Sequence, residues 1–318
     1  MKFLKLTTTD PYYNLAVEEY LLTHTSEDVF MLWQNSPTVV IGKNQNAYAE
    51  VDLKFAEENG IMVARRITGG GAVYHDLGNI NYSYITSSNG SLDFARLSRP
   101  IISALGKLGI TAELGGRNDI LIGDKKISGN AQHTSNGRTL HHGTLLFDVD
   151  TDTMSRVLRV DKEKLDHHGV KSHKSRVANI KELLPQGTTS ADFLSALESF
   201  IIKELNAQTV TVEDSAEISA LEERNKSREW ILSSKRFLTD YNLKKKKRYP
   251  YGSVEVSLSL EGDIIKSISI NGDFFSLSPI ESLEAKLVGK RLTDKNIPDV
   301  SKYIASMTNE EFFALLNE

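Results

Sequence analysis

The chain has 318 residues, of which 40% are hydrophobic and 25% are charged, and its formal net charge is −4. This composition is that of an ordinary globular protein and gives no sign of general nucleic-acid binding. Because 318 residues exceed what one hydrophobic core usually supports, we expect one large domain and one small domain.

The chain lacks long apolar segments and cysteine, and these two absences exclude several locations and mechanisms. Residues 1–8 lack the apolar run of a signal peptide, and no segment approaches the roughly 18 apolar residues of a membrane span, so we expect a cytoplasmic protein without a membrane partner. The chain contains no cysteine. This excludes disulfides, thiolate zinc sites, iron–sulfur clusters and every mechanism that passes through a thioester on the enzyme.

The first half of the chain alternates between helical and extended patterns. Asp10 followed by Pro11 is typical of a helix start, and apolar residues then recur at helical spacing. The next predicted elements are strands over residues 29–33 and 38–41, a helix over 52–59 that ends at Gly60, and a strand over 61–64.

Strands continue to be interleaved with helices after a run of three glycines at residues 69–71. We predict strands over residues 81–85, 120–122, 126–128 and 143–147, and helices over 94–108 and 193–205. Strands that come from distant segments and alternate with helices indicate a mixed α+β domain.

The pattern breaks at a run of basic residues, Lys244 to Arg248, which precedes a turn-like segment ending at Gly252. We predict a linker over residues 244–252, between a large domain of residues 1–243 and a small domain of residues 253–318. In the small domain, alternating residues predict a hairpin over 254–270, and helices follow over 280–287 and 308–316.

The segment from Arg65 to Asp76 has the composition of a phosphate-binding loop. Three consecutive glycines let the backbone approach a ligand and let successive N–H groups converge on an anion, while two arginines supply positive charge. It is neither a Walker A loop nor a dinucleotide fingerprint, because the required lysine and third glycine are missing. A glycine turn with solvated arginines is the alternative interpretation.

A second candidate constellation is Gly116 to Asp119 followed by Lys125 to Gln132. A lysine beside a strand and a small-residue turn can hold its ammonium against a phosphate and a carboxylate. On these residues alone, an ordinary lysine at a strand edge is the more common explanation.

Taken together and in order, these motifs resemble the lipoate–protein ligases of the biotin/lipoate ligase superfamily. The resemblance covers nearly the whole chain and implies a large mixed-sheet α+β catalytic domain with a small α+β C-terminal domain. The matching segments are Arg65 to Asp76 with Gly78-Asn79, Gly116 to Asp119, Lys126 to Gly129, His141 to Leu146, Ser175 to Ile180, and the region from Tyr249 onward.

The resemblance implies an ATP-dependent reaction in two steps. Lipoate and ATP give lipoyl-adenylate and pyrophosphate, and a lysine of an acceptor lipoyl domain then forms an amide and releases AMP. The implied acceptors are E2 subunits of 2-oxoacid dehydrogenases and the glycine-cleavage H protein, and Mg²⁺ is the implied metal. The alternatives are an ATP-independent octanoyl or lipoyl transferase, which generally uses the cysteine that is absent here, and a non-catalytic lipoyl- or nucleotide-binding module.

The resemblance also assigns roles to residues. Lys126 matches the essential lysine and is expected to contact the α-phosphate and the lipoyl carbonyl without forming a Schiff base, and His75 is expected to border the acyl pocket. Asp119 matches a position that helps to hold Mg²⁺, although Asn118 and Asp119 fit a turn-fixing role equally well. The expected binding residues are Arg66, Gly70, Gly71, Ala72, Val73, Tyr74, His75, Asn118, Asp119 and Lys126.

Other charged and titratable clusters are given lesser roles. The histidines at 141–142, 167–168 and 173 lack carboxylate or cysteine partners at ligand spacing, so we expect structural or solvated side chains rather than a metal site. The basic run from Lys244 to Arg248 is more typical of a solvated linker, with attraction of acidic carrier domains as the alternative. We expect the C-terminal domain to swing about residues 235–250, because a reactive anhydride is best shielded from water.

Overall fold

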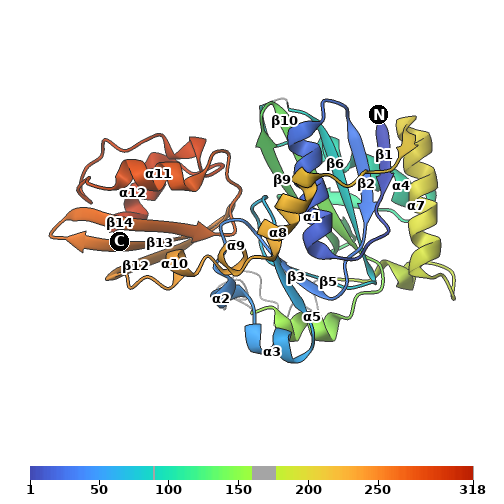
Figure 1. Ribbon diagram of the computed structural model, residues 1–318, viewed down its shortest axis with the longest axis horizontal. Coiled ribbons are helices and arrows are strands. Elements are labelled where there is room, and N and C mark those ends of the chain that lie inside the picture. Colours follow the sequence, from blue (N-terminus) through green and yellow to red (C-terminus); the bar gives the residue numbers. More distant parts are fainter. Residues whose placement is uncertain (89, 160–176, 318) are drawn as a thin grey trace.

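The computed structural model describes residues 1–88, 90–159 and 177–317. Figure 1 shows a larger body, built mainly from the blue-to-yellow part of the chain, and a smaller orange-to-red body at one side. The larger body is organised around an eight-stranded sheet with the order β11-β1-β2-β6-β10-β9-β8-β7. Its strands are β1 (Lys2–Lys5), β2 (Val29–Trp33), β6 (Asn79–Ser87), β7 (Glu113–Gly115), β8 (Asp119–Ile122), β9 (Lys125–Ser135), β10 (Arg138–Leu146) and β11 (Gln208–Val210).

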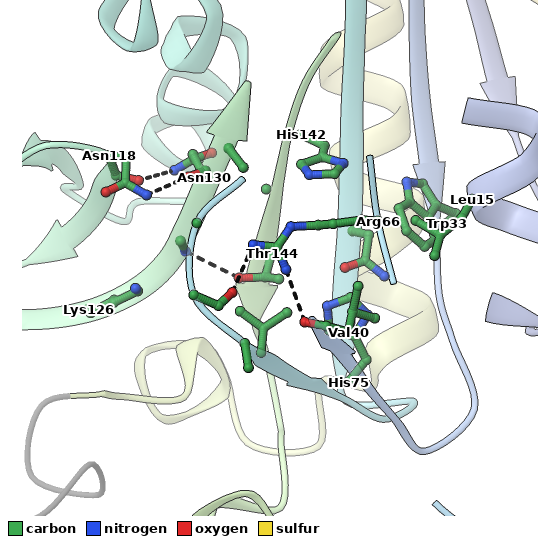
Figure 2. Close-up of a pocket in the computed structure, with 18 residues that line it drawn as sticks. Leu15, Trp33, Val40, Arg66, His75, Asn118, Lys126, Asn130, His142 and Thr144 are labelled. Atoms are coloured by element: carbon green, nitrogen blue, oxygen red, sulfur yellow. Dashed lines mark hydrogen bonds between the residues drawn. The ribbon is translucent and has the colours of Figure 1, made fainter. Parts of the chain in front are cut away.

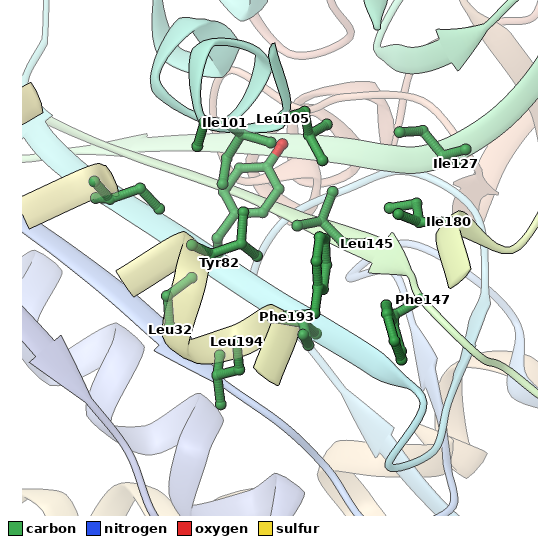
Figure 3. Packing of buried hydrophobic residues seen from close by; sticks show 14 of the residues in the cluster. Leu32, Tyr82, Ile101, Leu105, Ile127, Leu145, Phe147, Ile180, Phe193 and Leu194 are labelled. Carbon is green, nitrogen blue, oxygen red and sulfur yellow. The ribbon is translucent and has the colours of Figure 1, made fainter. Parts of the chain in front are cut away.

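The sheet is mixed, with β1 parallel to both β11 and β2 and the remaining neighbours antiparallel. One face packs against α4 (Phe94–Lys107) and α7 (Ser190–Leu205), and this core includes the stacked rings of Phe147 and Phe193, 4.9 Å apart (Figure 3). The other face packs against α1 (Pro11–His24), which α8 (Ala216–Lys226) covers in turn.

Strand alternation separates the two faces. Phe30 and Leu32 of β2 belong to the core under α4 and α7, whereas Met31 and Trp33 belong to the core under α1. Helix α1 begins at Asp10, whose carboxylate accepts the N–H groups of Tyr12 and Tyr13, as the sequence predicts.

A second, three-stranded sheet lies beside the α1 face of the main sheet. It consists of β4 (Met62–Arg65), β3 (Thr38–Ile41) and β5 (Val73–His75), with β3 in the centre. The short helices α2 (Ala47–Glu50), α3 (Leu53–Glu58) and α5 (Thr151–Val157) complete this region. The 3-10 helix η2 (Ile180–Leu183) packs through Ile180 into the core under α4 and α7.

The smaller body is an antiparallel sheet covered by helices around its own core. Its elements are β12 (Leu243–Tyr249), β13 (Gly252–Glu261), β14 (Ile264–Gly272), α11 (Ile280–Leu287), η3 (Val300–Lys302) and α12 (Asn309–Asn317). These elements and the main sheet confirm the α+β class. None of the helices in the described ranges has the length and apolar character needed to cross a bilayer.

The linker expected over residues 244–252 is not observed, because most of that segment forms β12 and pairs with β13. Lys244 and Lys246 are exposed, while Lys245 and Lys247 are half-buried, which is the alternation of a strand. Long aliphatic lysine stems can cover a sheet face while their charges stay in water. The chain instead passes between the bodies through α9 (Arg228–Leu232) and α10 (Ser234–Phe237).

Candidate active site

Two cavities adjoin on the α1 side of the main sheet, and Lys126 borders both of them. The first has a volume of about 110 Å³ and extends between the main sheet and the three-stranded sheet. The second has a volume of about 500 Å³ and extends from Lys126 past Asp119 and Asp124. Ala72, Val73, Gly129 and Thr144 also border both cavities, so they form a shared wall.

The structure brings together all of the residues that the sequence predicts for the site. Those that line the first cavity are Arg66, Gly70, Gly71, Ala72, Val73, His75, Asn118 and Lys126. Tyr74 and Asp119 line the second cavity together with Ala72, Val73 and Lys126. In Figure 2, Lys126 and Asn118 lie on one side of the first cavity and Trp33, Leu15 and His75 on the other.

Arg66 braces the glycine loop from within. Its Nη2 donates to the carbonyls of Gly69 (2.7 Å) and Gly71 (2.8 Å), its Nη1 donates to the carbonyl of Val40 (3.0 Å), and its Nε donates to Thr68 Oγ1 (2.9 Å). Burial lowers the pKa of Arg66 to about 10, so the guanidinium still carries its charge at neutral pH. Most of its donors therefore hold the shape of the loop.

Close backbone approach explains why the loop contains glycine. Gly70 has a φ of +90°, in the left-handed region that residues with a side chain rarely adopt. A Cβ atom on Gly42 would lie 2.1 Å from the carbonyl oxygen of Gly70, which leaves no room for one. The loop is thus fitted to the end of β3 by backbone contact.

A buried hydrogen-bond chain connects Arg66 to a carboxylate. Thr68 Oγ1 accepts from Arg66 Nε and lies 2.8 Å from Nε2 of His142, and Nδ1 of His142 donates to the carboxylate of Glu18 (2.8 Å), because a carboxylate oxygen only accepts. Glu18 is 1% exposed and also accepts from Ser83 Oγ (2.6 Å). The chain places a negative charge behind the buried cation of the loop.

Arg65 does not fit the phosphate-binding role that the paired arginines predict. Its guanidinium donates to the backbone carbonyls of Gly42, Lys43 and Gln45 and to those of Trp230 and Ile231. Burial, followed by the charges of Arg236 and Arg66, lowers its pKa to about 9. Arg65 therefore ties α9 to the glycine-loop region and faces neither cavity.

Lys126 is held by a single carboxylate. Its Nζ lies 2.9 Å from Asp119 Oδ1, and the two side chains are 35% and 34% exposed. Gly129 leaves room for this ammonium, because a Cβ there would lie 2.9 Å from Nζ. Asn118 instead fixes the turn before β8, because its amide and that of Asn130 each donate to the other's backbone carbonyl.

His75 is buried and uncharged at the far side of the first cavity from Lys126. Its Nδ1 accepts from Asn35 Nδ2 (3.0 Å), and burial, with smaller effects of Arg66 and His142, lowers its pKa to about 3. Across residues 1–88, 90–159 and 177–317, no group of three or more His, Asp or Glu side chains could hold a metal. The histidines at 167, 168 and 173, for which we predict no metal site, lie outside the described residues. Residues 175 and 176, the start of the matching segment Ser175 to Ile180, also lie outside them.

The smaller body reaches the site through residues that the sequence did not indicate. The N–H of Gly70 donates to the carbonyl of Phe274 (3.3 Å), and the guanidinium of Arg117 lies 4.4 Å from the ring centroid of Phe275. Phe275 also packs on Phe94 at 5.3 Å. No local pattern in the sequence could have revealed these contacts, because each joins segments far apart in the chain.

Comparison with known proteins agrees with this geometry. Residues 10–202 match the lipoyl protein ligase A/B catalytic domain, and residues 239–316 match the bacterial lipoate protein ligase C-terminus. The chain belongs to the lipoyl protein ligase family. It is 40% identical to lipoate-protein ligase LplJ of Bacillus subtilis, over 96% of this chain and 97% of the relative. It is 38% identical to lipoate–protein ligase 1 of Staphylococcus aureus, over 91% and 90% respectively.

Solved structures of lipoyl protein ligases share the fold. P. falciparum LipL1 in complex with lipoate superposes with a TM-score of 0.80 over 100% of this chain and 99% of its own, at 22% identity. A lipoate-protein ligase A bound with ATP gives a TM-score of 0.61 at 29% identity, covering 73% of this chain and 98% of its own. A bipartite ligase of Thermoplasma acidophilum, described with its E2 lipoyl domain, gives 0.63 at 30% identity, covering 76% and 98%. The chain is thus an enzyme of the ligase class, as its motifs predict.

Proposed function

We propose that this enzyme uses ATP to convert lipoate into lipoyl-adenylate and then transfers the lipoyl group to a lysine of an acceptor lipoyl domain. The observation that carries the proposal is the position of Lys126 at the junction of two cavities. We assign the lipoyl chain to the first cavity and the nucleotide to the second. Their reacting groups then meet at the Lys126 ammonium.

The first step joins two anions, a carboxylate and the α-phosphate of ATP. Their mutual repulsion opposes the attack unless positive charge lies where they meet. The Lys126 ammonium supplies this charge by leaving Asp119 for the reacting oxygens, and the backbone of Ala72 and Val73, which border both cavities, lies beside the phosphate. The carboxylate oxygen forms the bond to phosphorus, and pyrophosphate leaves.

The second step needs no nucleophile from the enzyme. The mixed anhydride is already activated, so the neutral amine of the acceptor lysine attacks the carbonyl, AMP leaves with the bonding electron pair, and the nitrogen loses one proton to water. The absence of cysteine therefore fits this route and argues against an ATP-independent transferase that forms a thioester.

The residues around Lys126 also fit a Mg²⁺ ion that is bound with the nucleotide. Mg²⁺ in such sites is usually held by one or two carboxylates and by substrate phosphates. Asp119 has a second oxygen beside the one that contacts Lys126, and Asp124 borders the same cavity. These two carboxylates would hold the ion, which would neutralise charge on the triphosphate.

The proposed reaction attaches the lipoyl group to particular acceptor proteins. We expect lipoyl domains of 2-oxoacid dehydrogenase E2 subunits and the glycine-cleavage H protein to be modified. Incubation with lipoate, Mg·ATP and an apo lipoyl domain should add one lipoyl group to the acceptor and release pyrophosphate. An acceptor of unchanged mass, with no pyrophosphate, would remove the proposal. Product formation without ATP would favour the transferase instead.

A further inference from the structure

Two buried N–H donors line the first cavity without a partner among the described residues: His75 Nε2 and Asn81 Nδ2. His75 is 3% exposed and Asn81 is 2% exposed. Leaving a buried donor unpaired is costly, so such groups generally face a ligand or water. The surrounding wall is largely apolar, with Leu15, Trp33 and Val40 among its residues.

The protons on these two atoms follow from the neighbouring hydrogen bonds. Asn35 Oδ1 accepts from Asn14 (3.0 Å), which turns Asn35 Nδ2 toward His75 Nδ1 and leaves the single proton of the neutral ring on Nε2. In the structure, Asn79 Nδ2 donates to Asn81 Oδ1 (2.9 Å), and Asn81 Nδ2 has no hydrogen-bond partner among the described residues. Two residues of the cavity lining, His75 and Asn81, therefore each have a donor that needs an acceptor.

Sheet register fixes the place of Asn81 between the two ends of the cavity. Asn81 on β6 pairs with Trp33 on β2 and with Thr144 on β10, and directly paired residues share one face of a sheet. The hydroxyl of Thr144 accepts the N–H of Gly129 on β9 (3.2 Å), the strand that also carries Lys126. The strand that carries Asn81 is thus two strands away from the strand that carries Lys126, and the two strands are separated by about 10 Å.

We propose that His75 Nε2–H and Asn81 Nδ2–H donate hydrogen bonds to the sulfur atoms of the lipoyl dithiolane and so select this acid over a straight-chain one. The inference rests on the proposed function, which places the carboxylate at Lys126 and directs the remainder of the acid toward β6 and β2. Lipoate carries its sulfur ring at the end opposite the carboxylate. Sulfur lone pairs are acceptors, whereas the tail of octanoate offers only C–H groups to the same donors.

The selectivity follows from the cost of unpaired donors. A site that is built to hydrogen-bond a substrate group discriminates strongly against an analogue without that group. Because sulfur is a weak acceptor, we expect a preference for lipoate over octanoate of about tenfold in kcat/KM rather than the larger factors seen with oxygen or nitrogen. Removal of a donor should lower the rate with lipoate and leave the rate with octanoate the same or higher.

The test measures kcat/KM for lipoate and for octanoate with the full-length enzyme, Mg·ATP and an apo lipoyl domain. Asn81→Leu should reduce the preference for lipoate about fivefold or more. His75→Leu should do the same, whereas His75→Gln, whose Nε2 can occupy a similar position, should retain most of the preference. The control Thr144→Val removes a hydroxyl at the Lys126 end of the cavity and should affect both acids equally.

The outcomes separate this inference from the proposed function. If the wild-type enzyme modifies the acceptor with neither acid, the proposed function fails. If it is active and both leucine variants keep the wild-type preference, the inference is overturned. Calorimetric binding of the two acids gives a second readout that does not require turnover, so a variant with impaired catalysis still reports its selectivity.

Discussion

Lys126 and Arg66 line the same cavity and carry the same charge, but their surroundings differ. Lys126 is one-third exposed and contacts a single carboxylate, so its ammonium can change partners. Arg66 is 6% exposed and donates to three backbone carbonyls and a threonine hydroxyl. One cation is available to a reacting ligand, and the other is used to hold the walls of the cavity in place.

This difference divides the site into two parts, which we call the chemical half, around Lys126, and the structural half, around Arg66. A mobile ammonium suits a step in which negative charge moves between oxygens, whereas a planar guanidinium with several fixed donors suits the bracing of a loop. The buried chain through Thr68 and His142 to Glu18 belongs to the structural half. Changes to the two cations should consequently affect different observables.

The largest expected effect is on activity, from Lys126→Ala. Loss of an ammonium aimed at developing charge should lower acceptor labelling and pyrophosphate release at least about 100-fold. The free energy of unfolding should change by no more than about 0.5 kcal/mol, because the ion pair with Asp119 is partly exposed. Lys125→Ala, at an exposed neighbour on β9, is the matched control and should remain active. Normal turnover by the Lys126 variant would contradict its assigned role.

Arg66→Lys should instead act mainly on stability. A lysine cannot reproduce the four hydrogen bonds of the guanidinium, so the free energy of unfolding should fall by about 2–4 kcal/mol. Urea denaturation followed by circular dichroism measures this change, with the exposed Arg99→Lys as the control. A variant of unchanged stability that no longer binds ATP would show that Arg66 is a ligand contact and not a brace.

Much of the fold could be predicted because its signals are local. The capped start of α1, the strands β2 and β3, and the apolar stripes of α4 and α7 all follow from caps and periodicity within one segment. The short strands β1 and β11 cannot be predicted in this way, because only their pairing with distant partners defines them. The sequence of β12 predicts a linker, which is wrong, because its lysines obscure the alternation of a strand.

The candidate site shows the same limit. Residues 65–76 and 116–132 could be singled out because each is a compact motif. Glu18 and Asn81 could not, since α1 places Glu18 beside His142 and the register of β6 brings Asn81 to the cavity, and neither element has a chemical signature of its own. Without the family resemblance, which selects Arg66, the loop composition could not distinguish Arg65 from Arg66, because their difference lies in which carbonyls surround each guanidinium.

The end of the first cavity opposite Lys126 should also respond to acid, through His75. Its pKa is lowered to about 3, chiefly by burial, whereas in the unfolded chain it is about 6.5. Between these values only the unfolded chain binds the proton, so stability is present above pH 6.5 and is lost as the pH falls. Urea titrations at pH 6.5 and 4.5 should show that His75→Gln loses about 2 kcal/mol less than the wild type. The exposed His24→Gln should leave the loss unchanged.

The smallest effect concerns the contact between the glycine loop and the smaller body. A Cβ on Gly69 would lie 2.3 Å from the carbonyl oxygen of Phe274, whereas a Cβ on Gly71 would meet no atom of the described residues within 4 Å. Gly69→Ala should therefore separate the two bodies locally, lower the free energy of unfolding by about 1 kcal/mol, and speed hydrogen exchange at residues 270–276. Gly71→Ala should keep wild-type exchange there and raise the KM for ATP or lipoate, because its methyl group would occupy cavity space. Equal exchange in the two variants would mean that Phe274 does not hold the loop, and the brace would then lie within the larger body alone.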